Sequence, residues 1–284
     1  MTHIYGLKNN KVKVLGLGVF DGIHKGHQSI AKKCDALLTL FPHPDCFLGK
    51  SNCLKMLSTL REQRYYFNRL LVLHFTKEIS RLSAIAFLEE IVYKRIAPKE
   101  IVVGGDYQFG HKGEGDISLL RIWAKEKNIR VTIISECRLK DIPIRSSYIR
   151  ELLNNDKFND AVEMLGHSYL IIGKVVRGDG RGKTIGFPTS NLKVPSRKLV
   201  PKHGVYRGAV IFQRKIYRCL IYIGQKPTFN QTKEAIEVYI KGFSEEIYNR
   251  QLKVFIESKI RNDICFPDQG ALVSQIKKDL IQIG

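Results

Sequence analysis

The chain has few cysteines, and none is placed as a metal-binding or redox pair would be. Its 284 residues include six cysteines, with no C-x-x-C pair among them. This usage fits neither a disulfide framework nor a zinc site, and it predicts reduced thiols in a cytoplasmic protein. The sequence also shows no charged-then-apolar leader, and no apolar run approaches the ~20 residues of a membrane span. We therefore expect neither a secreted nor a membrane-embedded protein.

Acidic residues are also scarce relative to basic ones. There are 47 Lys and Arg residues against 27 Asp and Glu residues, which gives a formal net charge of +20. Such a positive field attracts polyanions, including nucleotides and nucleic acids. The charge is spread over both halves of the chain without a long basic block, so we interpret it as a solvated surface. No nucleic-acid or membrane partner is expected, and the sequence leaves the oligomeric state open.

The first half alternates apolar runs with helical patterns. This order is typical of an α/β domain with a parallel sheet and helices on both faces, and such sheets bind ligands beyond the carboxyl ends of their strands. The expected apolar strands are Val12–Leu17, Leu37–Phe41, Leu71–Phe75, Glu100–Val103 and Val131–Ile134. The expected helices are Ser29–Ala36, Thr59–Leu70, Glu78–Tyr93, Ile117–Lys127, Arg145–Leu153 and Phe158–Leu165.

The second half consists of short β-rich runs separated by Gly, Pro and charged turns. This pattern predicts an antiparallel barrel or sandwich, closed by a terminal helix at Ala271–Ile283. The expected strands are Tyr169–Val176, Val205–Phe212, Ile216–Ile223, Ile236–Phe243 and Leu252–Ile260. We place the domain boundary within Asn155–Ser168 and predict two domains, 1–160 and 168–284.

The most specific stretch is GVFDGIHKGHQ, which runs from Gly18 to Gln28 between an expected strand and an expected helix. Its glycines permit tight turns and close approach of a ligand. His24 and His27 are three residues apart, so they can face the same side and donate hydrogen bonds to phosphate oxygens. The start of a helix also favours anions. Seven specified positions in ten make a chance glycine-rich turn the weaker interpretation.

These residues resemble the H-x-G-H nucleotidyltransferase superfamily. The longer F-D-G-x-H form resembles the bacterial bifunctional riboflavin kinase/FAD synthetase family. The resemblance implies that the first domain transfers the adenylyl group of ATP to FMN, forming FAD and pyrophosphate, with Mg²⁺ on the ATP. It assigns His24 and His27 to the triphosphate and the transition-state charge. Nucleotide contacts are implied for Gly18, Phe20, Asp21 and Gly26, although Asp21 is also suited to supporting the turn.

Two further segments of the first half fit the same family. GGDYQFG, from Gly104 to Gly110, resembles its G-x-D-F-x-F-G segment and implies flavin contacts for Asp106, Tyr107 and Phe109. Taken alone, those aromatics favour a turn with core side chains. RSSYIR resembles the S-S-T-x-I-R segment and implies a phosphate site at Ser146, Ser147 and Arg150, although Tyr148 replaces the usual Thr.

The second half resembles the riboflavin kinase part of that family. GKVVRGDGRGKTIGFPTSNL, from Gly173 to Leu192, matches its G-F-P-T-A-N segment, with Ser190 in place of Ala. The resemblance implies ATP-dependent phosphorylation of riboflavin to FMN. Glu237 is the implied general base and Thr189 and Asn191 the implied Mg²⁺ and phosphate ligands. The remaining implied contacts are Gly178, Gly180 and Lys183 for phosphate and Arg261 for flavin.

Two departures from the family pattern lie in this half. Tyr222 stands where the family often has Asn before I-G in the segment leading to IGQKPTF, and Gly242 stands where it often has Asp before Phe. None of the residues assigned to catalysis is lost, and we expect a bifunctional enzyme; one alternative is that these changes weaken the kinase and leave mainly FAD synthesis. Two other interpretations remain open from the sequence: a sister H-x-G-H transferase acting on another phosphate substrate, and a basic RNA-binding protein with a vestigial nucleotide fold.

Overall fold

The computed structural model describes residues 4–7, 11–49, 54–178, 180–228 and 231–284, and only the backbone of 181, 226–228 and 231–234. The chain divides into two compact units between Ser146 and Ser147. The five cysteines in the described residues are free thiols, while Cys53 lies outside those residues. No helix in the described part of the chain is long and apolar enough to cross a membrane.

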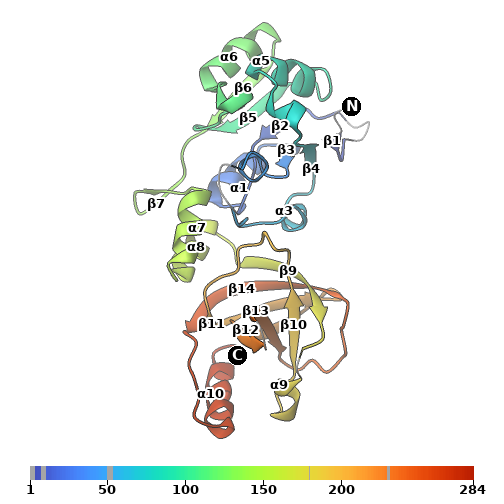
Figure 1. Cartoon of the computed structure of the whole chain (residues 1–284). Helices are drawn as coiled ribbons and strands as arrows, with labels where there is room; N and C mark the ends of the chain where they lie inside the picture. The colour runs from blue at the N-terminus through green and yellow to red at the C-terminus, as the bar shows by residue number, and fades with distance from the viewer. Residues whose placement is uncertain (1–3, 8–10, 50–53, 179, 229–230) are drawn as a thin grey trace. The chain divides into compact units, whose positions relative to one another are not determined.

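The first unit is built on a six-stranded sheet of order β1-β4-β3-β2-β5-β6, in which only β1 is antiparallel to its neighbour (Figure 1). This arrangement confirms the predicted α/β class with its parallel sheet. The strands are β1 (Ile4–Tyr5), β2 (Val14–Leu17), β3 (Ala36–Phe41), β4 (Leu70–His74), β5 (Glu100–Gly104) and β6 (Arg130–Ile134). A separate hairpin pairs β7 (Arg138–Leu139) with β8 (Ile142–Pro143).

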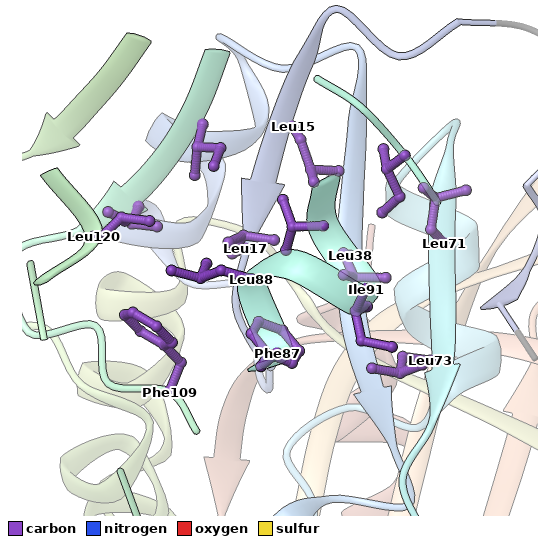
Figure 2. Packing of buried hydrophobic residues seen from close by; sticks show 14 of the residues in the cluster. Leu15, Leu17, Leu38, Leu71, Leu73, Phe87, Leu88, Ile91, Phe109 and Leu120 are labelled. Atoms are coloured by element: carbon purple, nitrogen blue, oxygen red, sulfur yellow. The ribbon is translucent and has the colours of Figure 1, made fainter. Parts of the chain in front are cut away.

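The central strands are mostly apolar, as expected for a parallel sheet that is covered on both faces. Leu15, Leu17 and Leu38 face one buried cluster, which Phe87 and Leu88 cover from a helical segment (Figure 2). Neighbouring positions on the same strands point to the other face and join a second buried cluster. That second cluster includes Phe20, Ile30, Leu37, Val72 and Val102.

Several helix boundaries differ from the sequence prediction. The helix expected at Ser29–Ala36 is α1 (Lys25–Ala31), and Ala36 already belongs to β3. The helix expected at Glu78–Tyr93 is broken because Ser83 accepts a hydrogen bond from the amide of Ala86 and starts a new helix. The remaining helices are α2 (Pro44–Phe47), α3 (Leu60–Tyr66), α4 (Lys77–Ser80), α5 (Ala84–Phe87), the π-helical η1 (Leu88–Tyr93), the 3₁₀ turn η2 (His111–Gly113) and α6 (Ile117–Glu126).

The second unit is a closed antiparallel barrel of order β10-β13-β12-β11-β14-β9, with β9 pairing back to β10. Closure decides between the predicted barrel and sandwich in favour of the barrel. Its strands are β9 (Tyr169–Val176), β10 (Thr189–Lys193), β11 (Gly204–Phe212), β12 (Lys215–Thr228), β13 (Gln231–Ile240) and β14 (Gln251–Arg261). The strand expected to reach Phe243 ends at Ile240, because Gly242 turns the chain with a φ of +69°.

Four helices accompany the barrel strands: α7 (Ser146–Asn154), α8 (Phe158–Leu165), α9 (Arg181–Thr184) and α10 (Gln269–Ile281) (Figure 1). Phe158 of α8 packs edge-on against Tyr169 and Tyr206 of the barrel. This contact explains why the compact unit begins earlier in the chain than the predicted kinase domain at 168. The functional division at 1–160 and 168–284 stays a prediction.

Candidate active sites

The loop between β2 and α1 is held in a conformation that few residues adopt. Phe20 and Ile23 have φ angles of 57° and 55°, and both side chains are buried. Gly22 has a φ of +87°, and its amide donates to the Ser58 hydroxyl over 2.8 Å. Two non-glycine residues in the left-handed region cost free energy that surrounding structure must offset, and such sites concentrate where function requires a fixed backbone.

Asp21 is the anchor of that loop. One carboxylate oxygen accepts from the amide of Ser58 over 2.8 Å, and the other accepts from the amide of Leu57 over 3.2 Å. The side chain is only 2% exposed. Of the two roles expected for Asp21, support of the turn is the one that this geometry fits. Ser58 carries no local sequence signal for this role, because it lies 37 residues away along the chain.

The two histidines of the motif stack on one another. The ring centroids of His24 and His27 are 3.6 Å apart, with an angle of 21° between the planes. Phe20 packs edge-on against the His27 ring at 5.4 Å. The predicted nucleotide contact of Phe20 is therefore restricted to its backbone, because its side chain is fully buried and supports His27 instead.

His27 carries a polar atom that the protein itself does not satisfy. Its Nδ1 is buried and has no hydrogen-bond partner among the described residues. Burial, followed by the neighbouring His24, lowers the pKa of His27 well below its usual 6.5. An unsatisfied buried imidazole nitrogen is costly unless a ligand completes it, and a phosphate oxygen is suited to that role.

Two glycines of the motif are required for space. A Cβ at Gly26 would lie 3.3 Å from the His24 ring, and a Cβ at Gly18 would lie 3.1 Å from the Phe20 ring. Neither glycine has a positive φ. Their lack of a side chain thus lets the two rings lie against the backbone of the loop.

The GGDYQFG segment follows β5 as predicted, but its aromatic side chains differ in role. Phe109 is buried in the main hydrophobic cluster near Phe87, so its ring serves the core, and its flavin contact stays a prediction (Figure 2). Tyr107 stacks on Phe109 with centroids 5.5 Å apart and is half-buried. Asp106 is exposed beside it. The alternative interpretation of this segment, a turn with core aromatic side chains, describes Phe109. Of the three predicted flavin contacts, only Asp106 and Tyr107 remain accessible to a ligand.

The RSSYIR segment begins α7. The Ser146 hydroxyl donates to the backbone carbonyl of Asp21 over 2.7 Å, which ties this segment to the histidine loop. Ser147 is exposed and Arg150 is half-buried on the same helix. Ser146 therefore supports the loop, while Ser147 and Arg150 keep the phosphate-binding role as a prediction.

A basic cavity of about 620 Å³ lies at the amino-terminal edge of the parallel sheet. Parallel sheets bind their ligands at the opposite, carboxyl edge, where the histidine loop follows β2. We therefore do not assign the nucleotide to this cavity. Its basic lining residues are Lys13, Lys99, Arg121, Lys125 and Arg130.

In the barrel, three predicted kinase residues meet on adjacent strands. Asn191 of β10 is paired directly with Glu237 of β13. The Thr189 hydroxyl donates to Oε2 of Glu237 over 2.8 Å. Directly paired residues of an antiparallel ladder project from the same face, so a carboxylate, an amide and a hydroxyl are gathered at one place. The motif spacing along the chain does not reveal this, because 48 residues separate Thr189 from Glu237.

The glycine-rich connection before β10 approaches these residues closely. A Cβ at Gly178 would lie 2.1 Å from Nδ2 of Asn191. Gly180 has a φ of +71°, and its carbonyl accepts from the amide of Lys183 over 3.0 Å. The Lys183 side chain is exposed. Asp179 within this connection and Phe229 of IGQKPTF lie outside the described residues.

Arg261, predicted to contact the flavin, pairs with a buried carboxylate of the terminal helix. Its Nε and Nη2 donate to the Asp279 carboxylate of α10 over 3.0 and 2.8 Å, and its Nη1 donates to the carbonyl of Asn262. Asp279 is only 2% exposed. The guanidinium therefore anchors the terminal helix to the barrel, and the expected flavin contact of Arg261 stays a prediction. No local pattern pointed to this partner, since Asp279 lies in an ordinary helical stretch.

Known proteins resemble this chain over both units. Residues 7–148 match the FAD synthetase family, and residues 165–283 match the riboflavin kinase family. A bifunctional riboflavin kinase/FMN adenylyltransferase of Buchnera aphidicola (subsp. Schizaphis graminum) is 33% identical, covering 98% of this chain and 95% of its own. The Listeria monocytogenes protein of the same name is 32% identical, covering 94% and 90% respectively.

A solved structure gives the same result for the fold. A crystal structure described as a macrolide-efflux protein from Streptococcus pneumoniae superimposes with a TM-score of 0.85 at 28% identity. The match covers 98% of this chain and 95% of that one. Both domain families are matched in order, and the sequence relatives cover nearly the whole chain. This chain therefore belongs to the bifunctional riboflavin kinase/FMN adenylyltransferase family.

Proposed function

We propose that the barrel unit phosphorylates riboflavin to FMN and that the first unit adenylylates FMN to FAD. The kinase half is supported chiefly by the convergence of Thr189, Asn191 and Glu237 on one face of the barrel. The adenylyltransferase half is supported by the stacked His24 and His27 with a buried, unsatisfied Nδ1 on His27. Both reactions are named for the relatives that span the whole chain.

In the kinase reaction, the 5′-hydroxyl oxygen of riboflavin attacks the γ-phosphorus of ATP. The bond from that phosphorus to the β-phosphate bridging oxygen breaks, and ADP leaves. Glu237 accepts the hydroxyl proton, a role that suits a carboxylate in a hydroxyl-lined site. The hydrogen bond from Thr189 orients this carboxylate. Gly178, which lies against Asn191, is assigned to the phosphates together with Gly180 and Lys183.

Magnesium fits this group of residues. The Thr189 hydroxyl donates its proton to Glu237, which leaves oxygen lone pairs for a cation, and Asn191 offers a carbonyl oxygen beside it. Mg²⁺ takes oxygen ligands and usually keeps several waters, with few protein groups and the substrate phosphates completing its shell. The ion would neutralise the phosphate charge of ATP.

In the adenylyltransferase reaction, a phosphate oxygen of FMN attacks the α-phosphorus of ATP, and pyrophosphate leaves. No protein nucleophile is required, so the protein contributes positioning and charge stabilisation. His24 and His27 bind the triphosphate, with His27 supplying Nδ1 to a phosphate oxygen. Ser147, Arg150, Asp106 and Tyr107 are assigned to the substrates of this step, and Asp21 and Ser146 to support of the loop. The free thiols are compatible with action in the cytoplasm.

A product assay tests both halves. Protein is incubated with riboflavin, ATP and Mg²⁺, and the flavins are separated over time. We expect FMN first and FAD later. His27→Ala should accumulate FMN, and Glu237→Gln should leave riboflavin unchanged while still converting supplied FMN to FAD. If neither flavin reacts with the wild-type protein, the proposed function is wrong.

A further inference from the structure

A continuous row of paired residues crosses one face of the barrel. Asn191 of β10 pairs with Glu237 of β13, Glu237 pairs with Tyr222 of β12, and Tyr222 pairs with Val205 of β11. Val205 and Tyr222 pack in a cluster with Leu280 of α10 and with Ile283 after it, neither of which belongs to the barrel strands. The row therefore lies on the outer face, with Glu237 flanked by Asn191 on one side and Tyr222 on the other.

The two sides of Glu237 differ in chemistry. On the Asn191 side are the hydroxyl of Thr189 and the close-lying Gly178, which suit phosphate and a cation. The substrate hydroxyl that gives its proton to Glu237 lies between two groups. The phosphate that it attacks is on one side, and the rest of the acceptor molecule is on the other. Because the phosphate side is the Asn191 side, the acceptor approaches from the Tyr222 side.

Tyr222 is fixed in place by two contacts. Its hydroxyl oxygen lies over Gly224, where a Cβ would be 2.1 Å away. The same hydroxyl donates to Oδ2 of Asp263 over 3.1 Å, and Asp263 lies in the segment between β14 and α10. Burial and the nearby carboxylates of Asp263 and Glu237 raise the pKa of Tyr222 to about 12, so the phenol stays protonated and remains a donor.

We propose that Tyr222 and Asp263 together form the acceptor-side wall of the kinase site and set its affinity for the flavin. The phenol ring offers a flat apolar surface to the ring system of the acceptor, and the exposed Asp263 carboxylate accepts hydrogen bonds from its hydroxyl groups. Tyr222 is thus a specificity-determining residue of this chain, at a position where the sequence family often has Asn. The inference rests on the proposed kinase function of the barrel.

Binding and kinetics together test this wall. Riboflavin affinity is measured by quenching of flavin fluorescence, which needs no turnover, and the KM values for riboflavin and for ATP are measured separately. Tyr222→Phe and Asp263→Ala should each weaken riboflavin binding about tenfold, as expected for loss of a hydrogen bond to a charged group. The KM for ATP should change less than twofold.

Two further variants separate this role from a merely structural one. Asp263→Asn keeps an acceptor oxygen for the phenol and should retain most of the riboflavin affinity. The double variant Tyr222→Phe with Asp263→Ala should be no weaker than Asp263→Ala alone, because the phenol hydroxyl acts through that carboxylate. Conversion of supplied FMN to FAD by the same samples checks that the first unit is intact.

The outcomes separate the proposed role of Tyr222 and Asp263 from the proposed kinase function on which it rests. Unchanged riboflavin affinity in both single variants overturns the wall, and so does a parallel rise in the KM values for riboflavin and ATP. Wild-type protein that binds riboflavin without phosphorylating it contradicts the proposed function but leaves the wall testable by binding. Wild-type protein that does not bind riboflavin overturns both.

Discussion

Gly178 lies so close to Asn191 that no side chain fits between them. A Cβ at Gly178 would be 2.1 Å from Nδ2 and 2.5 Å from Cγ of Asn191. The nearest atoms belong to the end of an amide side chain, which can move, rather than to the backbone. Gly178→Ala should therefore displace the amide of Asn191 while leaving the barrel folded.

This relationship gives the first prediction. We expect Gly178→Ala to lower kcat/KM of riboflavin phosphorylation by about tenfold to a hundredfold, because a misplaced ligand of the phosphate costs more than the packing change. The measurement is the initial rate of FMN formation, with the thermal transition of the barrel as a control for folding. FAD formation from supplied FMN should be unaffected. A variant with wild-type kinase rates would show that Asn191 does not act in the site.

The depressed pKa of His27 predicts how stability depends on pH. The unfolded chain takes up a proton on this imidazole near pH 6.5, whereas the folded protein resists it, so stability is complete above that pH and falls below it. Between pH 7.5 and pH 5.5, this one group should cost at most about 1.4 kcal/mol of the free energy of unfolding. Urea unfolding of the wild-type protein and of His27→Asn at both pH values isolates the effect. Between pH 7.5 and pH 5.5, the free energy of unfolding should fall more for the wild-type protein than for His27→Asn.

Nucleotide binding should raise the lowered pKa of His27. Phosphate charge beside Nδ1 of His27 favours the protonated imidazole, so ATP binding is expected to take up a proton near pH 6.5. Titration calorimetry in two buffers of different ionisation enthalpy, each at pH 6.5, measures the uptake. His27→Asn should bind ATP more weakly and with little uptake. Equal heats in both buffers for the wild-type protein would argue against a phosphate contact at His27.

Arg261 should matter for stability rather than for flavin binding. Arg261→Met leaves the buried carboxylate of Asp279 without its cation, which typically costs about 3–5 kcal/mol. Replacing both partners, Arg261→Met with Asp279→Leu, should recover part of this loss. The unfolding transition of the barrel unit measures both. A selective rise in riboflavin Kd without loss of stability would instead restore the flavin-binding role.

The sequence alone determined the features that depend on local patterning. Apolar runs of strand length, helical periodicity and glycine-rich turns yielded the α/β unit, the β unit and their order, because these signals reside in residues close together in the chain. The dense motif around His24 and His27 likewise predicted the first site, since the spacing of two imidazoles near a tight turn is itself a local property. Helix ends were less well predicted, because capping by Ser83 competes with continuous periodicity.

Tertiary structure decided which side chains reach a site and which support it. Phe109 and Arg261 have the residue types of ligand contacts, yet one packs in the core and the other pairs with Asp279. The row that joins Asn191, Glu237 and Tyr222 depends on barrel closure and strand register. Register and partner choice are set by contacts between residues far apart in the chain, and a single sequence carries no local signal for them. The motifs therefore identified the chemistry, and the packing assigned the residues to it.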